Sequence, residues 1–325
     1  MIVVTGGAGF IGSAIIWKLN QMGIEDIIVV DRFDENEKWR NLIPLRFMDV
    51  FDSEAFLEYM THDFLEKAGV ETIFHMGAIS ATTEKNFDNL LRNNYELSKL
   101  LCNQSLNNNI RFIYASSAAT YGSGENGYDD DEEKIFTLRP LNGYGYSKQL
   151  FDQWAYKNRI LDKIVGLKYF NVFGPNEYHK DDMRSVVHKC YEQIRDTGKA
   201  SLFKSTVDGL EDGEQKRDFI YIKDAVDMTI YFMENKIVNG IYNVGTGKAT
   251  SFNSFVNAIF SALELEPSIE YFDMPNDLIN KYQNFTQANM KKLTDTGYKL
   301  NTTPIEAAVK DYVQEYLVTD NPYLH

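Results

Sequence analysis

The sequence has few cysteines, a deficit of positive charge and no long apolar run. Its only two cysteines, Cys102 and Cys190, do not form the spaced cysteine and histidine sets of a metal centre, so we expect reduced core thiols and no metal site. Lysine and arginine number 33 against 47 aspartates and glutamates, which leaves a net charge of −14. That charge repels phosphate backbones and anionic lipids, so nucleic acid and membranes are poor partners.

No apolar stretch approaches the roughly 18 residues of a membrane span, and no basic segment precedes the first apolar run. We therefore expect a cytoplasmic protein. The chain has 325 residues, of which 44% are hydrophobic and 25% are charged. Such a chain is long enough for one large globular domain or two modest ones.

Short apolar runs alternate with amphipathic stretches through the first half of the chain. The runs typical of strands are residues 2–5, 27–31, 45–48, 72–75, 112–115 and 164–169. This alternation predicts an α/β fold built on a Rossmann-type, doubly wound parallel sheet. The pattern is less regular beyond Asn171, which indicates a smaller mixed α/β domain. We assign residues 1–170 and 218–245 to the Rossmann domain, and residues 171–217 and 246–325 to the smaller domain.

Three glycines follow the first predicted strand. Gly6, Gly9 and Gly12 stand at intervals of three, and residues 13–22 then have the apolar spacing of a helix. The first two glycines allow a tight turn and let a pyrophosphate approach the N–H groups of the helix N-terminus, while the third lets helix and strand pack closely. The loop therefore predicts a dinucleotide site.

The end of the second predicted strand bears on which dinucleotide is bound. Asp31 stands there, and a carboxylate at this point suits the ribose hydroxyls of NAD. Arg32 adjoins it and Lys38 follows, and these cations suit the additional phosphate of NADP. The balance of charge favours NADP, with NAD as the alternative.

A second group of polar residues has the pattern of a catalytic site. Ser116 and Ser117 follow the strand at 112–115, while Tyr144 and Lys148 are four residues apart and so share one face of a helix. The ammonium and a positively charged nicotinamide both favour the phenolate, so we expect a lowered pKa for Tyr144 and a role as base. Ser117, or its neighbour Ser116, is expected to hydrogen-bond the same substrate oxygen.

Together these motifs resemble the extended short-chain dehydrogenase/reductases over nearly the whole chain. Within that superfamily the sequence is similar to the nucleotide-sugar epimerases that act on ADP-heptose. The narrower resemblance rests on residues 3–13, 114–122, 142–148, 169–175, 179–180, 216–219 and 282–288.

The resemblance implies an isomerase of lipopolysaccharide heptose synthesis. Such an enzyme oxidises C6″ of ADP-D-glycero-D-manno-heptose to a transient aldehyde and reduces it again on the other face, with the same NADP kept throughout. It also implies that Tyr144 and Lys180 are opposed acid/base groups, that Lys148 orients the cofactor, and that the protein is a homo-oligomer. The Rossmann domain would bind the cofactor and the smaller domain the substrate.

The same resemblance assigns binding residues. Those expected at the cofactor, besides the three glycines, are Phe10, Ile11, Asp31, Arg32, Lys38, Met76, Gly77, Ala78, Ile79, Ser80, Asn93, Lys148, Val172 and Lys180. Those expected at the substrate are Ser117, Asn171, Phe203, Lys204, Ser205, Thr206, Arg217 and Tyr282.

The chain departs from the family pattern after Lys180, where a Gly-Ser pair is usual. Asp181 and Asp182 stand there instead, which predicts two carboxylates near an anionic substrate. A nucleotide-sugar 4-epimerase is the alternative enzyme, because it shares the fold and the catalytic set. A catalytically silent NADP-binding regulatory protein is the alternative outside enzymes.

Overall fold

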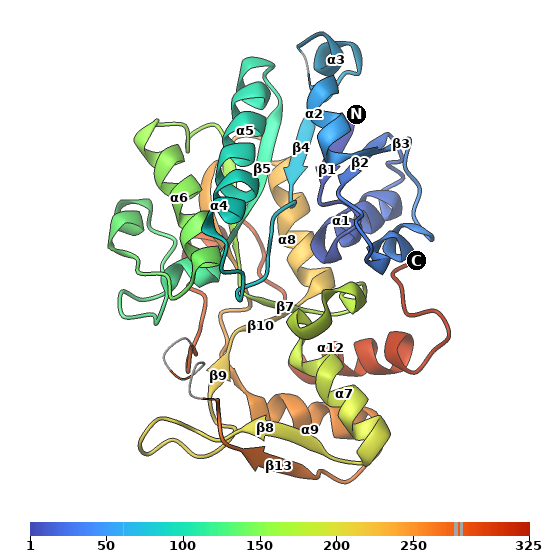
Figure 1. The fold of residues 1–325 in the computed structure, drawn as a ribbon, viewed down its shortest axis with the longest axis vertical. Coiled ribbons are helices and arrows are strands. Elements are labelled where there is room, and N and C mark those ends of the chain that lie inside the picture. Colours follow the sequence, from blue (N-terminus) through green and yellow to red (C-terminus); the bar gives the residue numbers. More distant parts are fainter. Residues whose placement is uncertain (61, 276–278, 280–281) are drawn as a thin grey trace.

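The computed structural model describes residues 1–60, 62–275, 279 and 282–325. Its main element is a seven-stranded parallel sheet in the order β11-β6-β5-β4-β1-β2-β3 (Figure 1). The strands are β1 (Ile2–Thr5), β2 (Ile27–Asp31), β3 (Asp49–Asp52), β4 (Thr72–His75), β5 (Arg111–Ser117), β6 (Val165–Tyr169) and β11 (Gly240–Val244). The predicted doubly wound sheet is confirmed, because each pair of neighbours in it is parallel.

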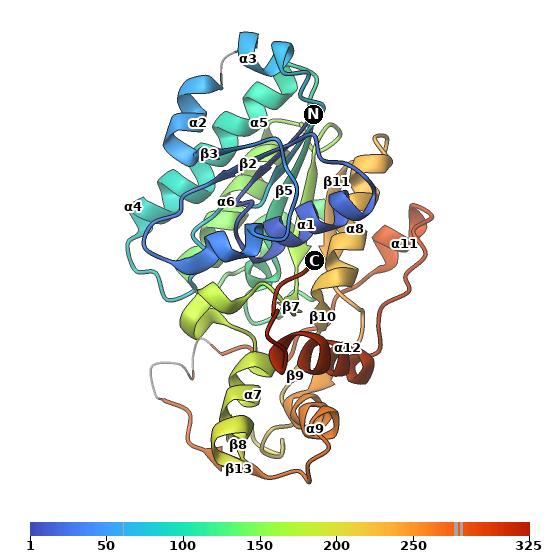
Figure 2. The same ribbon diagram turned by 90° about the vertical axis from the view of Figure 1, so that its right-hand side faces the viewer.

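Helices cover both faces of this sheet because successive strand residues point to opposite faces. Val4 and Val29 pack with α1 (Phe10–Gln21) and α8 (Ile222–Glu234) in one buried cluster. Their neighbours Val3 and Ile28 pack in a second cluster with α2 (Ser53–Tyr59), α5 (Leu97–Asn107) and α6 (Gly143–Lys157). In Figure 2, α2 and α5 lie on one side of the sheet and α1 and α8 on the other.

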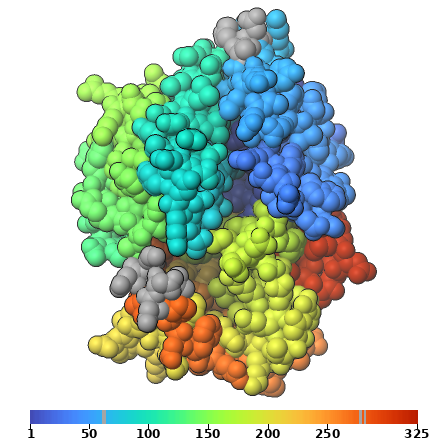
Figure 3. Space-filling view, in the orientation of Figure 1, coloured from blue at the N-terminus to red at the C-terminus, as the bar shows by residue number. Residues whose placement is uncertain are grey.

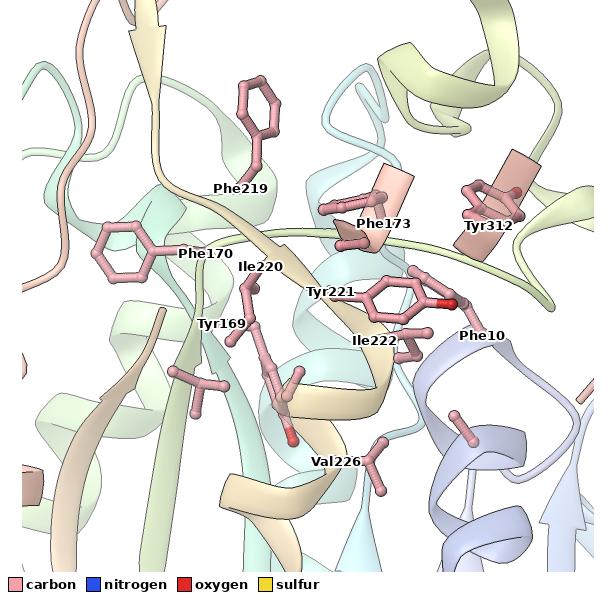
Figure 4. Close-up of a cluster of buried hydrophobic side chains, with 14 of the residues drawn as sticks. Phe10, Tyr169, Phe170, Phe173, Phe219, Ile220, Tyr221, Ile222, Val226 and Tyr312 are labelled. Atoms are coloured by element: carbon pink, nitrogen blue, oxygen red, sulfur yellow. The ribbon is translucent and has the colours of Figure 1, made fainter. Parts of the chain in front are cut away.

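A second group of strands and helices forms the lower part of the molecule in Figure 1. Three two-stranded sheets pair β7 (Asn171–Phe173) with β10 (Phe219–Tyr221), β8 (Ala200–Phe203) with β13 (Ile269–Phe272), and β9 (Lys216–Arg217) with β12 (Thr250–Ser251). The helices of this part are α7 (Val186–Thr197), α9 (Phe252–Ala262) and α12 (Ile305–Tyr312). Aromatic side chains join it to the sheet: Phe10, Phe173, Tyr221 and Tyr312 belong to one buried cluster (Figure 4).

Shorter elements complete the described chain. They are α3 (His62–Lys67), α4 (Phe87–Leu90) and α11 (Lys291–Asp295), the 3-10 turns Glu37–Leu42, Ala118–Tyr121, Glu132–Thr137 and Tyr178–Met183, and the π turns Leu91–Glu96 and Val313–Leu317. Within the described ranges, no helix is both long and apolar enough to cross a membrane. Nor do the described residues hold a group of three or more side chains suited to a metal ion.

The prediction of a third strand at residues 45–48 is wrong. The strand is β3, at residues 49–52, and it pairs with β2 at the edge of the sheet. An edge strand is exposed, so its sequence carries little apolar alternation, and Asp49, Val50 and Asp52 are exposed here. The apolar signal before it comes from Leu45, which packs in the core without being part of a strand.

Candidate active site

The glycine loop joins β1 to α1 in a tight turn. Gly6 has a φ of +65°, and a Cβ on it would lie 2.5 Å from the backbone nitrogen of Gly77. A Cβ on Gly12 would lie 2.1 Å from the carbonyl oxygen of Gly6, so only glycine fits there. Gly9 is the N-cap residue of α1, and because glycine has no side chain it cannot accept a hydrogen bond from the N–H groups of the first helical turn. The N–H groups of that turn therefore face the cavity side of the loop with no side chain to satisfy them, which suits an anion.

Asp31 and Lys38 form an ion pair beside this loop. The Oδ2 atom of Asp31 accepts a hydrogen bond from the N–H group of Ala8 (2.8 Å). Its Oδ1 atom accepts from the N–H group of Arg32 (2.7 Å) and from the Lys38 ammonium (2.7 Å). A carboxylate has about four acceptor sites, so three of those on Asp31 are already used. Arg32 itself is exposed and pairs with Asp34.

The predicted cofactor residues gather around three adjoining cavities. A cavity of about 380 Å³ lies beside Asp31 and Asn93, the next, of about 370 Å³, follows the glycine loop, and the third, of about 360 Å³, lies beside Tyr144. They adjoin because Asp31 and Gly77 line the first two and Phe10 lines the last two. Figure 3 shows a recess at the first of them, between the blue and the cyan segments.

Each predicted cofactor residue lines at least one of these cavities. They are Gly6, Gly9, Phe10, Ile11, Gly12, Asp31, Arg32, Lys38, Met76, Gly77, Ala78, Ile79, Ser80, Asn93, Lys148, Val172 and Lys180. The carboxyl ends of parallel strands are where such folds bind dinucleotides. The arrangement fits a dinucleotide laid along the groove, although binding itself stays a prediction.

The four predicted catalytic residues line the third cavity together. Ser117 ends β5, Tyr144 and Lys148 lie on α6, and Lys180 reaches the cavity from the turn Tyr178–Met183. The Lys148 ammonium donates to the Ala115 carbonyl (2.9 Å), which fixes the position of the ammonium in the wall of the cavity. The Lys180 ammonium lies 5.3 Å from the centre of the Phe10 ring, within range of a cation–π contact.

The expected lowering of the pKa of Tyr144 is not produced by the protein alone. Burial raises the pKa of the phenol, and a hydrogen bond with Ser117 only partly opposes this. Burial also lowers the pKa of Lys148 to about 8, so the charged form of that side chain is itself destabilised. The prediction required two positive charges near Tyr144, of which the chain supplies one. The cationic nicotinamide of an oxidised dinucleotide would act in the predicted direction.

The structure distinguishes the two neighbouring serines. Ser116 is buried and donates to the Asp152 carboxylate (2.8 Å), which also accepts from Tyr114 (2.9 Å) and pairs with Lys168 (2.7 Å). Ser117, on the opposite face of β5, is the serine that hydrogen-bonds Tyr144. Sequence reasoning missed Asp152 and Lys168, although a lysine inside the apolar run of β6 was a signal of a buried ion pair.

Asn94 is a second residue that sequence reasoning missed. Its side chain accepts from the Ile79 N–H (2.8 Å) and donates to the Ile79 carbonyl (2.9 Å) and to Ser147 (3.0 Å). These bonds hold residues 77–80, which line the groove, against α6. Asn94 lies in the π turn Leu91–Glu96, a local distortion that occurs often at functional sites.

A larger cavity of about 510 Å³ adjoins the catalytic one, since Asn171, Val186 and Phe252 line both. Among the predicted substrate residues, Asn171, Phe203, Arg217 and Tyr282 line it. Arg217 is 6% exposed and lies 5.0 Å from the ring of Tyr282 and 5.7 Å from that of Phe252. Its guanidinium donates to a neutral acceptor, the carbonyl of Lys216 (3.2 Å), and no anionic residue that the structure describes forms an ion pair with it.

Three predicted substrate residues are not brought to this cavity. Lys204 points to solvent and pairs with Asp273 (3.0 Å), Ser205 bonds the Val207 carbonyl within its own loop, and Thr206 is exposed. The loop that carries them turns away directly after Phe203, because β8 ends there.

The structure does not place Asp181 and Asp182, which were expected near an anionic substrate, at either of these cavities. Both side chains are exposed, and neither lines the catalytic cavity or the larger one. Asp181 has a φ of +44°, which a glycine adopts more easily, and its side chain lines a fourth cavity, which shares Asn36 and His179 with the cavity at the glycine loop.

Comparison with known proteins agrees with this arrangement. The family described as "NAD dependent epimerase/dehydratase family" matches residues 2–245. A protein of Nitratidesulfovibrio vulgaris strain DP4, named ADP-L-glycero-D-manno-heptose-6-epimerase, is 52% identical over 324 residues and all of both chains. A protein of the same name from Fusobacterium nucleatum is 47% identical, again over the whole of both chains. The crystal structure of the Helicobacter pylori protein of that name has a TM-score of 0.78 at 27% identity, over 97% of this chain and 95% of that one.

Proposed function

Since the chain belongs to the NAD dependent epimerase/dehydratase family, we propose that it is an isomerase that inverts C6″ of ADP-D-glycero-D-manno-heptose. The product is ADP-L-glycero-D-manno-heptose, a precursor of the heptose in lipopolysaccharide. Relatives that bear this enzyme's name align with the chain from end to end at 47% and 52% identity. A 4-epimerase and a silent regulatory protein stay as alternatives that the experiment below separates.

The observation that carries the proposal is a set of cations without anionic partners along one groove. Lys148 is 4% exposed, Arg217 is 6% exposed, and Lys180 is half-buried. None of the three forms an ion pair with a residue that the structure describes, although the protein as a whole carries a net charge of −14. Buried cations are costly unless an anion offsets them. A dinucleotide and a sugar nucleotide with a diphosphate supply those anions.

A bound nicotinamide dinucleotide supplies reversible hydride transfer at the substrate carbon. The protein fits such a group because the loop glycines leave no room for side chains and the N–H groups of α1 are uncapped. The chain's own residues handle the proton of the C6″ hydroxyl. Tyr144, polarised by Ser117, takes and returns it in one orientation of the sugar, and Lys180, across the same cavity, does so in the other. Lys148 orients the cofactor and favours the phenolate.

We propose that the dinucleotide is NADP. Ala8, Arg32 and Lys38 already occupy three acceptor sites of Asp31, which leaves that carboxylate poorly placed to accept two ribose hydroxyls. Lys38 and Arg32 both line the cavity beside Asp31, where they suit a ribose phosphate. Mass spectrometry of the dinucleotide released from the purified protein tests this choice.

We further propose that the seven-stranded sheet binds the cofactor and that the lower part binds the sugar nucleotide. Phe203, Arg217 and Tyr282 of the larger cavity come from the lower part. Residues 218–245 contribute to both, because β10 pairs with β7 while β11 joins the sheet.

The test is to incubate the purified protein, without added cofactor, with ADP-D-glycero-D-manno-heptose and to separate the two C6″ epimers. We expect a mixture dominated by the L-glycero form, and a loss of at least about 100-fold in rate for Tyr144→Phe combined with Lys180→Ala. Lys204→Ala is the matched control, since Lys204 lies outside the cavities. A double variant as fast as the wild type would refute the mechanism. Turnover of UDP-glucose but not of ADP-heptose would favour a 4-epimerase, and a bound dinucleotide without turnover would favour a regulatory protein.

A further inference from the structure

Glu177 is a completely buried carboxylate three residues before Lys180. It is 0% exposed, and within the described part of the chain no cation lies close enough to pair with it. Its oxygens accept hydrogen bonds from the N–H (2.5 Å) and the hydroxyl (2.6 Å) of Ser185 and from the hydroxyl of Tyr312 (3.0 Å). Burial of an unpaired carboxylate is costly, and here it raises the pKa of Glu177. A residue that destabilises the fold in this way calls for another role.

The hydrogen bonds of Glu177 close a loop whose middle reaches the catalytic cavity. Glu177 stands at one end and Ser185 at the other, and Lys180 lies between them in the turn Tyr178–Met183. Ser185 is the N-cap of α7, since its hydroxyl accepts from the N–H of His188. One face of α7 lines the larger cavity. The carboxylate of Glu177 therefore connects the loop that carries Lys180, in the catalytic cavity, to α7, which lines the larger cavity.

Tyr312 ties the same carboxylate to the C-terminal part of the chain. Tyr312 belongs to α12 and lies with Phe173 and Tyr221 in the buried cluster of Figure 4. Its hydroxyl is 135 residues away from Glu177 in the sequence. The loop with Lys180 is thus attached to a rigid core, which limits how far the lysine can move.

Glu177 also acts on Lys180 through its charge. Burial lowers the pKa of Lys180, and the negative charge of Glu177 raises it. The other titratable groups that face Glu177 are Tyr178 and Tyr312, and burial together with the Glu177 charge raises the pKa of both phenols. Those phenols are neutral at ordinary pH, so Glu177 is the group that opposes the loss of the Lys180 proton.

We propose that Glu177 is a positioning residue for Lys180: it closes the loop over residues 177–185 and places a negative charge near the amine, beyond the distance of an ion pair. The inference rests on the proposed function, in which Lys180 exchanges a proton with the sugar hydroxyl. Glu177 would thus influence the proton transfer by Lys180 without itself contacting the substrate or the cofactor.

The first experiment replaces Glu177 by Gln, which keeps the size and most hydrogen bonds but removes the charge. We expect kcat for ADP-heptose epimerisation to fall about tenfold with KM changed less than about twofold, and the pH at which Lys180 loses its proton to move down. Tyr312→Phe is the matched control, because it removes one donor to the same carboxylate and leaves the charge. We expect its pH profile to stay that of the wild type and its kcat to fall less than that of Glu177→Gln, because the bonds to Ser185 still close the loop.

A second readout does not depend on activity. The acetylation of Lys180 by acetic anhydride, followed by mass spectrometry from pH 6 to pH 10, reports its deprotonation, and exposed Lys204 is the reference in the same molecule. Glu177→Gln should be acetylated at Lys180 at a lower pH than the wild type. If the wild type does not turn over ADP-heptose, the proposed function fails while this measurement still tests Glu177.

Equal acetylation and equal pH profiles for the wild type and Glu177→Gln would overturn the inference and leave Glu177 a structural residue. If Glu177→Gln does not fold, Glu177→Asp carries the test, because it keeps the charge and withdraws the carboxylate from Ser185. We then expect an unchanged acetylation profile with a lower kcat, and a wild-type kcat would overturn the inference.

Discussion

Arg217 offers the sharpest test of the substrate cavity, because replacing it by Met should weaken binding without weakening the fold. Met keeps an unbranched stem between the rings of Phe252 and Tyr282 and removes the guanidinium. In the free protein that cation is buried, it donates a hydrogen bond to a neutral carbonyl, and burial lowers its pKa. Its removal therefore relieves a desolvation cost.

The magnitude follows from what the guanidinium would do in the complex. A hydrogen bond between a charged group and a phosphate contributes about 1.5–3 kcal/mol, which corresponds to about a 10- to 150-fold change in affinity. We expect Arg217→Met to weaken the binding of ADP by that factor in isothermal titration calorimetry, and to lower kcat/KM by a similar factor. We expect the free energy of unfolding in urea to stay the same or to rise by up to about 1 kcal/mol.

Lys204→Met is the control for Arg217→Met, since Lys204 is exposed and its partner is Asp273. Its affinity for ADP should change less than about twofold. The reasoning fails if Arg217→Met binds ADP as tightly as the wild type. It fails equally if Arg217→Met loses several kcal/mol of stability, because the guanidinium would then support the fold and not the ligand.

Three further predictions concern strain, protonation and the glycine loop. Asp181→Gly should raise the free energy of unfolding by about 1–2 kcal/mol in urea denaturation, because glycine adopts the positive φ of this position without strain; no gain would contradict this. Burial lowers the pKa of His75 to about 3 and those of His179 and His188 to about 4, below the value of 6.5 for free histidine. The unfolded chain therefore binds more protons than the folded one below pH 6.5, so the free energy of unfolding should fall from pH 6.5 towards pH 4. His75 alone should account for a loss of about 2 kcal/mol at pH 5. His75→Asn should make the free energy of unfolding depend less on pH in urea denaturation between about pH 4 and pH 8. Gly12→Ala should abolish dinucleotide binding in fluorescence titration, because its Cβ would lie 2.1 Å from a carbonyl oxygen of the loop; binding at the wild-type affinity would show that the loop can shift.

The sequence was informative wherever the chemistry depends on residues close together in the chain. The glycine loop follows β1 and opens α1, and Tyr144 and Lys148 share one face of α6 because they are four residues apart. Parallel strands buried on both faces are almost continuously apolar, so the central strands were visible as well. The edge strand β3 was misplaced for the converse reason, since an exposed strand carries no such signal.

The sequence could not reveal which polar side chains are buried, or which way a turn directs them. Nothing local indicates that Arg217 is enclosed by two aromatic rings while Lys204, the residue directly after β8, faces solvent. The outward direction of Asp181 depends on a single positive φ, and the orientation of Ser116 depends on Asp152, 36 residues later.

The sequence by itself determined the sheet, the glycine loop and the tyrosine–lysine pair, because strand periodicity, turn geometry and helix periodicity are short-range properties of the chain. The tertiary structure alone decided that Lys180 lines the same cavity as Tyr144, and that Glu177 meets Tyr312 across 135 residues. Such contacts depend on how distant segments pack against each other, and desolvation, which sets the cost of a charge, exists only after that packing is complete.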